Sequence, residues 1–325
     1  MDIINKEDID VNYIDGNNIN YPSTFDYISQ KFPLAVRRYL PIILKNHNPK
    51  VFHSSYFRIC KNKSTKNIVT VHDFIYEKYD RGLRKRVHLT QKNYALRNAD
   101  AIVCVSENTK QDLISYSPWI DESIVRVIHN GVSNDFFVEG DSGNLHVDTS
   151  TPYILFVGSR HQHKNFDAVI SLMQTETVES LGLSLVTVGG GELSQQHELL
   201  LSPITAKGKY KHISSVSNSV LRKLYNEAYC FVYPSLYEGF GIPPLEAMAC
   251  GCPVICSDSS SIPEVVGNAG LLFNPYKAEE AEEYLFKLNS EDYRNSIIQK
   301  GLKRSRELSS ENTGKNTVDL YKEFI

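Results

Sequence analysis

The sequence has no long hydrophobic run. Apolar stretches such as YILFV and CFVYP are far shorter than the roughly 18 residues of a membrane-spanning helix. The opening segment MDIINKEDID is acidic and lacks the apolar core of a signal peptide. We therefore expect no secretory leader and no membrane span. The expected localisation is cytoplasmic, and this includes peripheral binding at the inner face of the cytoplasmic membrane.

Three patterns that define other protein classes are also missing. With 35 Lys and Arg against 38 Asp and Glu, the net charge is −3, which disfavours a nucleic-acid partner. No GxGxxG motif follows an early strand, which disfavours a dinucleotide oxidoreductase. The cluster Cys250, Cys252 and Cys256 lacks the CxxC pairs of common zinc sites. We interpret it as core packing and expect no metal.

Short β-branched segments alternate with helical patterns through most of the 325 residues. This alternation is typical of parallel βαβ units. The chain is also longer than the roughly 250 to 300 residues at which one core usually splits. The expected strands are 51–53, 68–71, 101–105, 125–128, 153–157, 184–188, 230–233 and 254–255. The expected helices are 81–98, with Asp80 as its N-cap, and 165–173, 218–228, 244–250, 278–288 and 311–324.

The segment 136–151 loses this periodicity and gains Gly, Ser and Asp, so it is expected to be an interdomain linker. We predict an N-terminal acceptor-side domain over 1–135, a C-terminal nucleotide-sugar domain over 152–308, and a terminal helix over 309–325 that can pack back on the first domain. Two doubly wound α/β domains bind ligands at the carboxyl ends of their strands, and a cleft between facing domains would lie there.

The stretch YEGFGIPPLEAMACG, at 237–251, combines stiff, flexible and acidic residues. Pro243 and Pro244 suit the first turn of a helix, where an amide proton would go unused. Gly239 and Gly241 let the backbone approach a ligand closely. A helix N-terminus presented in this way favours the binding of phosphate oxygens.

A phosphate site does not explain Glu238 and Glu246, because a carboxylate beside a phosphate is repelled by it. An ionised carboxylate does accept strong hydrogen bonds from a vicinal diol, so the stretch suggests a sugar nucleotide. The alternative is structural: Glu246 would favour the first turn of a helix, and Glu238 would be a loop acid. From these residues alone the two interpretations weigh about equally.

Five segments together extend this pattern: PSLYEGFGIPPLEAMACGCPVICSDSSSIPEVVG at 234–267, FVGSRHQHKN at 156–165, VTVHDFIYE at 69–77, ADAIVCVSENTKQDL at 99–113 and VIHNGVSNDFF at 127–137. On these segments the chain, from about residue 50 to its end, resembles the retaining family-four glycosyltransferases. The resemblance implies a GT-B fold, in which two doubly wound Rossmann-like domains face a central cleft.

The resemblance also implies residue roles. Glu246 would hold the ribose hydroxyls, Glu238 the hydroxyls of the transferred sugar, and Lys164 the diphosphate leaving group. His72 would reach the donor sugar from the N-terminal domain. The implied catalytic residues are therefore His72, Lys164 and Glu238, and the implied donor-binding residues are Arg160, Gly189, Gly191, Phe240, Gly241, Ile242 and Glu246.

Several of these residues have a structural alternative. Lys164 could be a solvated lysine, although a cation at a helix start opposes the helix dipole unless an anion binds there. His72 could be a histidine that ends a strand, and Gly189 to Gly191 could form an ordinary strand-to-helix turn. Related sequences often carry an arginine close before the lysine. Here His163 precedes Lys164, and Arg160 is the nearest guanidinium.

The implied reaction is retaining transfer of a hexose from a GDP- or UDP-hexose to a saccharide or lipid-linked acceptor, in the synthesis of O-antigen or capsule polysaccharide. No cofactor is expected beyond this co-substrate. The only Asp-x-Asp triplet, Asp8-Ile9-Asp10, lies far in sequence from the motif, so no metal dependence is expected. Two alternatives remain: an inactive or partner-dependent glycosyltransferase-like subunit, which the lack of a glycine-rich loop in MDIINKEDIDVNYIDGNN favours, and a sugar-nucleotide epimerase of the same fold.

Basic residues suggest a further partner. The segment 81–99 carries six Lys and Arg and no acid, and RRYLPIILK at 37–45 mixes basic and apolar residues. One hypothesis is contact with an anionic membrane surface that holds a lipid-linked acceptor. The alternative is a solvated helix face.

Overall fold

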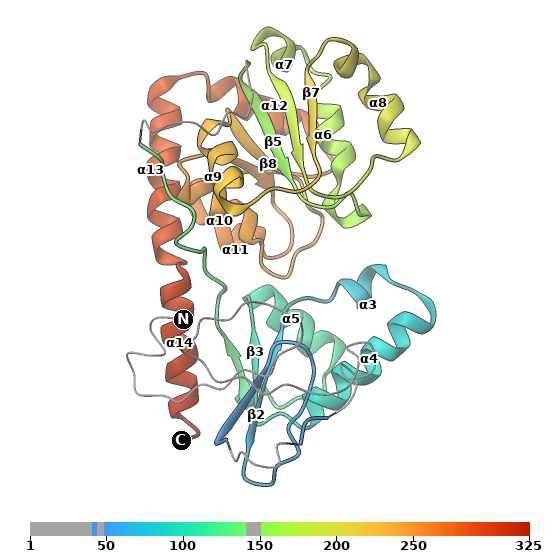
Figure 1. Cartoon of the computed structure of the whole chain (residues 1–325), viewed down its shortest axis with the longest axis vertical. Helices are drawn as coiled ribbons and strands as arrows, with labels where there is room; N and C mark the ends of the chain where they lie inside the picture. The colour runs from blue at the N-terminus through green and yellow to red at the C-terminus, as the bar shows by residue number, and fades with distance from the viewer. Residues whose placement is uncertain (1–40, 44–48, 141–150) are drawn as a thin grey trace. The chain divides into compact units, whose positions relative to one another are not determined.

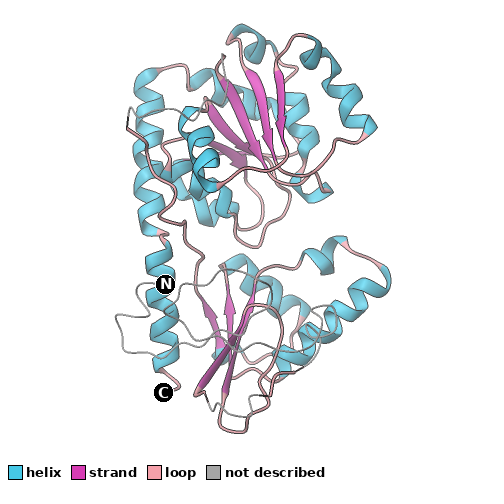
Figure 2. Cartoon of the chain, in the orientation of Figure 1, coloured by secondary structure: helices cyan, strands magenta, loops and turns pink. Residues whose placement is uncertain are grey.

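The computed structural model describes residues 41–43, 49–140 and 151–325. They form two compact units. Unit 1 comprises the described residues up to His129 together with Glu311–Ile325, and unit 2 comprises the described residues of Asn130–Ser310. Each unit holds one parallel sheet with helices packed around it (Figures 1 and 2). This confirms the expected pair of α/β folds. The Asp-x-Asp triplet, most of RRYLPIILK and most of the expected linker lie outside the described residues.

The sheet of unit 1 has the strand order β1-β2-β3-β4. Its elements are β1 (Val51–Ser54), β2 (Lys66–Val71), α3 (Ile75–Tyr79), α4 (Gly82–Arg97), β3 (Ala101–Cys104), α5 (Glu107–Tyr116), β4 (Val125–Val127) and α14 (Ser310–Lys322). Its core joins Ile68 and Val103 of the sheet to Leu320 of α14. The last helix of the chain, red in Figure 1, is thus part of unit 1.

Local capping sets where the helices of unit 1 begin. The Ser106 side chain accepts a hydrogen bond from the Thr109 amide and starts α5, as a serine N-cap does. The prediction that Asp80 caps the helix after it is wrong. A separate short helix, α3, occupies the preceding residues, so Asp80 is its C-cap, and Arg81 stands at the N-cap of α4 with no side-chain hydrogen bond.

Unit 2 contains a six-stranded sheet in the order β10-β9-β8-β5-β6-β7. Its strands are β5 (Tyr153–Val157), β6 (Ser184–Val188), β7 (Tyr210–Ile213), β8 (Cys230–Tyr233), β9 (Val254–Ser257) and β10 (Gly270–Phe273). Its α-helices are α6 (Phe166–Leu172), α7 (Glu176–Ser180), α8 (Gln195–Ala206), α9 (Asn218–Glu227), α10 (Ile242–Ala249), α11 (Ile262–Val266), α12 (Ala278–Lys287) and α13 (Glu291–Glu307). A core cluster of this unit includes Ile154, Val232 and Leu285.

The order in which the chain adds strands to this sheet changes direction once, at β5. From β5 it runs outward through β6 to β7, then returns to β8 on the other side of β5 and continues to β9 and β10. The loops that follow β5 and β8 therefore diverge at the carboxyl edge. Open α/β sheets bind ligands at such a switch point. The fold alone therefore predicts a ligand site formed by residues 158–165 and 234–241.

Candidate active site at the switch point of unit 2

The loop after β8 ends in a helix N-terminus built from glycine and proline. Gly241 is the N-cap of α10 with φ 107°, and prolines occupy its first turn. An L-residue rarely adopts this φ, so the glycine is required there. The prolines lie in the first turn of the helix, as predicted from the motif. Ile242, the first helical residue, is exposed, and Phe240 beside Gly241 is buried.

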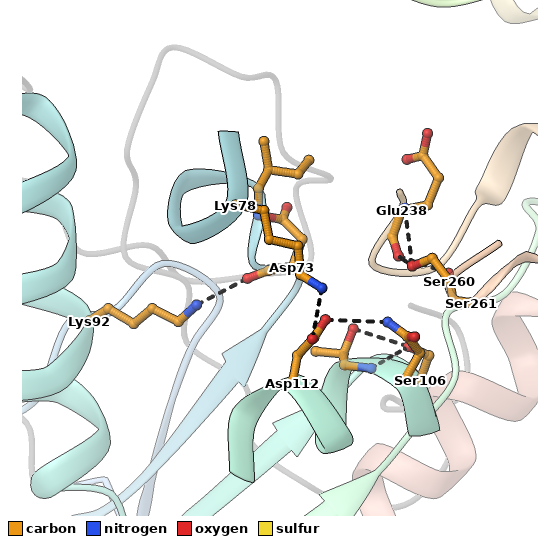
Figure 3. A network of polar contacts seen from close by, with 11 residues as sticks. Asp73, Lys78, Lys92, Ser106, Asp112, Glu238, Ser260 and Ser261 are labelled. Carbon is orange, nitrogen blue, oxygen red and sulfur yellow. Dashed lines mark hydrogen bonds and ion pairs between the residues drawn. The ribbon is translucent and has the colours of Figure 1, made fainter. Parts of the chain in front are cut away.

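Two serines from another loop hold this backbone in place (Figure 3). The Ser260 hydroxyl donates to the Glu238 carbonyl at 2.6 Å. The Ser261 hydroxyl donates to the carbonyls of Glu238, at 3.0 Å, and Phe240, at 2.8 Å. Both serines follow β9 within the long motif, and sequence reasoning gave them no role. The SSS run after the strand ICS was the available signal.

Lys164 and Glu238, two predicted catalytic residues, meet in an ion pair. Lys164 ends a short 3-10 helix, Gln162–Lys164, in the loop after β5. Its Nζ lies 2.7 Å from Glu238 Oε1 and 3.3 Å from the Tyr233 hydroxyl. The two side chains are only 17% and 11% exposed. Lys164 is therefore not the solvated lysine of the structural alternative.

The loops that carry this pair are tied to each other. The Leu236 amide donates to the His163 carbonyl at 2.7 Å, and the Asn165 side chain donates to the carbonyls of Pro234 and Pro275. These bonds fix the spacing between the loop after β5 and the loop after β8. The position of Lys164 relative to Glu238 is thus set by backbone contacts as well as by the ion pair.

Glu246 lies inside α10, past its first turn. That first turn contains no acid, so the alternative in which Glu246 favours a helix start is wrong. Its carboxylate accepts a hydrogen bond from the buried Tyr225 hydroxyl at 3.2 Å. Burial raises the pKa of Glu246, and the bond from Tyr225 lowers it in part. The tyrosine thus holds one carboxylate oxygen in a defined direction.

The glycine loop after β6 is held by Arg160. Gly189, Gly190 and Gly191 all have positive φ, at 77°, 83° and 69°. Arg160 Nη1 donates to the carbonyls of Gly189 and Gly191. The predicted residue Arg160, in the loop after β5 that also carries Lys164, is therefore brought together with Gly189 and Gly191, in the loop after the neighbouring strand β6.

His72 belongs to unit 1, where it follows β2 and is exposed. Next to it, the Asp73 side chain accepts a hydrogen bond from the Ile75 amide at 2.9 Å, so Asp73 caps the turn that follows β2. Lys92 of α4 donates to the Asp73 carbonyl at 3.0 Å (Figure 3) and to Glu77 Oε1 at 2.7 Å. Lys92 is 1% exposed. It is thus a buried support of the His72 turn, although the sequence pattern had placed it among the basic surface residues of its helix.

The described residues form neither a cluster of metal ligands nor a membrane-spanning helix. No group of three His, Cys, Asp or Glu in them could hold a metal ion. All six cysteines are buried and free, and burial raises the pKa of Cys250 to about 12. Among the described helices, none is long and apolar enough to cross a membrane.

Known sequence families cover most of the chain. The family described as "Glycosyl transferases group 1" matches residues 139–304, just over half of the 325 residues. The chain belongs to this family. A second family description, "Glycosyltransferase Family 4", matches residues 5–136. The long motif, the Lys164 loop and the glycine loop all lie within the group 1 match.

Individual relatives in this glycosyltransferase family are moderately similar. O-antigen chain mannosyltransferase B of Escherichia coli is 27% identical over 291 residues, which cover 86% of this chain and 76% of that protein. O-antigen chain mannosyltransferase RfbU of Salmonella typhimurium is 31% identical over 249 residues, which cover 73% of this chain and 64% of that protein. The solved structure of WaaG, described as a glycosyltransferase involved in lipopolysaccharide biosynthesis, aligns with a TM-score of 0.69 at 13% identity and covers 98% of this chain and 93% of that chain. The last likeness shows the GT-B fold alone.

Proposed function

We propose that the protein is a retaining glycosyltransferase that moves a hexose from a nucleotide diphosphate sugar to a saccharide or lipid-linked acceptor in O-antigen synthesis. The observation that carries the proposal is the Lys164–Glu238 pair beside the glycine-capped N-terminus of α10. Both lie at the switch point of a doubly wound sheet, where such folds bind nucleotides. The O-antigen relatives support the biological setting.

The site offers complementary groups to each part of the donor. Pro243 and Pro244 have no amide proton, so the N-terminus of α10 offers the amides of Gly241 and Ile242. These amides and the Lys164 ammonium suit a diphosphate, because both present positive charge to it. Glu246, oriented by Tyr225, suits the paired hydroxyls of the ribose. Glu238 suits the hydroxyls of the sugar. The donor would thus lie across the loops that follow β5 and β8.

Donor binding requires an exchange of partners. The Lys164 ammonium is occupied by Glu238 when the two lie 2.7 Å apart. A diphosphate competes for the same ammonium and repels the carboxylate. The exchange would leave Lys164 on the phosphate and turn the Glu238 carboxylate towards the sugar hydroxyls. Lys164 would then contact the leaving diphosphate and Glu238 the transferred sugar, on the two sides of the bond that breaks.

The proposed chemistry is attack of the acceptor hydroxyl on the same face that the diphosphate leaves. The C1–O bond to the diphosphate breaks, the bond to the acceptor oxygen forms, and a leaving phosphate oxygen takes the acceptor proton. Lys164 and the helix amides stabilise the negative charge that develops on the leaving group. Glu238 orients the sugar and forms no covalent bond, and His72 would contact the donor sugar from unit 1. Lys164 and the helix amides would supply the positive field, so the proposal includes no metal ion.

The hexose is proposed from the relatives, whose names specify mannosyl transfer and no nucleotide. We expect GDP-mannose or UDP-mannose as the donor. A thermal-shift panel of GDP, UDP and their hexoses tests this, because a ligand at 100 times its Kd stabilises the native state by about 2.7 kcal/mol. If none of these nucleotides raises the melting temperature, the central proposal is wrong.

Turnover separates the proposed function from its alternatives. Release of nucleoside diphosphate that depends on an added acceptor, and that Lys164→Ala abolishes, identifies a transferase. A partner-dependent subunit would bind the sugar nucleotide without releasing nucleoside diphosphate from it. An epimerase would convert the sugar nucleotide with no acceptor present. Membership of the glycosyltransferase family favours the first outcome over the last.

We also propose that α4 contacts an anionic membrane. Leu83 is 77% exposed and Val87 is 42% exposed, and both lie on the helix that carries Arg84, Lys85 and Arg86. Each basic residue near an anionic surface contributes about 1 kcal/mol. Sedimentation with vesicles that contain anionic lipid at low salt tests the idea. Vesicles of neutral lipid are the control, and equal sedimentation with both would contradict an electrostatic contact.

A further inference from the structure

The guanidinium of Arg160 has its terminal nitrogens fully engaged within unit 2. Nη1 donates to Gly189 O at 2.9 Å and to Gly191 O at 3.0 Å. Nη2 lies 3.2 Å from Thr187 Oγ1 and 3.0 Å from His212 Nδ1. The remaining nitrogen, Nε, is buried and has no hydrogen-bond partner among the described residues. A guanidinium carries five N–H donors, so these four contacts use every donor of the two terminal nitrogens.

This arrangement leaves Arg160 poorly placed to bind a phosphate. To reach one, it would have to release a loop carbonyl, Thr187 or His212. The His212 contact also requires a neutral ring whose Nδ1 accepts the bond. Burial and the neighbouring Arg160 charge both lower the pKa of His212 and thereby favour the neutral form.

The loop and the guanidinium fit closely against each other. A Cβ added at Gly190 would lie 2.6 Å from Arg160 Nη1 and 2.6 Å from the Gly158 carbonyl. Gly190 also has φ 83°, which an L-side chain rarely adopts. The loop therefore depends on glycine for its conformation, and it depends on Arg160 for the two carbonyl bonds that hold its ends.

We propose that Arg160 is a positioning residue that fixes the glycine loop against which the donor nucleotide binds, and that it does not itself bind the diphosphate. The inference rests on the proposed function. Lys164 and the amides of α10 would then be the groups of unit 2 that stabilise the departing diphosphate. A loop contact of this kind strengthens donor binding equally in the ground and transition states. A direct contact with the diphosphate would strengthen as charge develops during bond breaking.

Steady-state kinetics with the full-length protein distinguishes the two roles. We expect Arg160→Ala to raise the donor KM about tenfold, the effect of losing about 1.4 kcal/mol of binding free energy, with kcat nearly unchanged, as for uniform binding. Arg160→Lys should behave like Arg160→Ala, because one ammonium cannot reproduce the forked contacts. His212→Ala removes one anchor and should raise KM less. Lys207→Ala, a basic residue with a 56% exposed side chain, is the matched control and should change neither constant.

Three results would overturn the inference. One is a fall in kcat for Arg160→Ala as large as that for Lys164→Ala, and another is restoration of activity by Arg160→Lys, because both indicate a direct charge contact. The third is a wild-type KM in folded Arg160→Ala. The proposed function has its own outcome: if the wild-type protein neither binds nor releases a nucleotide, both proposals are wrong. Circular dichroism of each variant shows that it is folded, and His212→Ala provides a KM measurement if Arg160→Ala is not.

Discussion

Neutralising Glu238 should make the protein bind free nucleoside diphosphate more tightly while making it a poorer enzyme. Glu238→Gln keeps the side-chain shape and removes the charge that holds Lys164 at 2.7 Å. At an effective dielectric constant near 20, this separation corresponds to a gross attraction of about 6 kcal/mol. The cost of desolvating two mostly buried groups offsets much of it. We expect the net effect to resemble that of a hydrogen bond to a charged group, about 1.5 to 3 kcal/mol.

In the wild-type protein, a nucleoside diphosphate that binds Lys164 must break the Lys164–Glu238 ion pair, and its net stabilisation is lost. In the variant there is no ion pair to break. The affinity of GDP or UDP for Glu238→Gln should therefore rise at least about tenfold, the equivalent of about 1.4 kcal/mol. Isothermal titration calorimetry measures this affinity. Turnover of the sugar nucleotide should fall, because glutamine offers the sugar hydroxyls one acceptor oxygen where glutamate offers two.

A double-mutant cycle provides the control. Lys164→Met should weaken binding of the diphosphate, and adding Glu238→Gln to it should restore little, because the carboxylate then has no ammonium to occupy. If Glu238→Gln alone binds GDP and UDP no more tightly than the wild-type protein, the proposed exchange of partners is refuted.

Three further changes test other parts of the structure. Lys92→Met leaves the buried Glu77 without its cation and should lower the free energy of unfolding by about 3 to 5 kcal/mol in urea titrations; adding Glu77→Leu should recover much of the loss. Burial lowers the pKa of His53 to about 4, so only the unfolded chain gains a proton as the pH falls from about 6.5 to about 4. Urea titrations should show stability declining over that window, and less steeply in His53→Gln. Gly241→Ala places a side chain at φ 107° and should cost about 1 to 3 kcal/mol and weaken diphosphate binding, as thermal shift and calorimetry will show.

The interior strands were predictable because burial on both faces leaves a continuous apolar signal. The bounds of β5, β6 and β8 agree with the sequence prediction residue for residue. The strands at the two ends of the same sheet were missed. β7 reads YKHI and is only partly buried, and β10 begins with a glycine. β7 carries two polar residues and so lacks an apolar run, whereas the apolar run of β10 is only three residues long after its glycine.

The longest of the described helices, α13 (17 residues), was missed for a different reason. Its buried positions are Ile297, Gly301 and Ser305, two of which are small and give no apolar stripe. A Cβ added at Gly301 would lie 3.2 Å from Met248 Cγ of α10, so α13 packs through close approach of its backbone. Periodicity of large apolar residues cannot reveal a helix of this kind.

The candidate site could be proposed from the sequence where its residues lie within one segment. The glycine cap, the prolines and the two glutamates of the long motif could be interpreted together from the sequence. Their supports could not, because Tyr225 contacts Glu246 from another helix, and Ser261, although it lies in the same motif, reaches the Glu238 carbonyl from the loop after β9. Lys92 was misplaced for the same reason, since its buried partner, Glu77, lies on another helix.

These supports determine how the Lys164–Glu238 pair can act. Ser260 and Ser261 hold the Glu238 backbone at its carbonyl, and the loop of Lys164 is bound to the Glu238 loop through the His163 carbonyl. An exchange of partners therefore needs only side-chain rotation, since neither backbone has to move. The desolvation of both charged groups has also already occurred in the folded protein, because each side chain is mostly buried. A diphosphate would thus contact the Lys164 ammonium after most of its hydration has been lost. In this environment of low dielectric constant, the stabilisation of charge is stronger than in water.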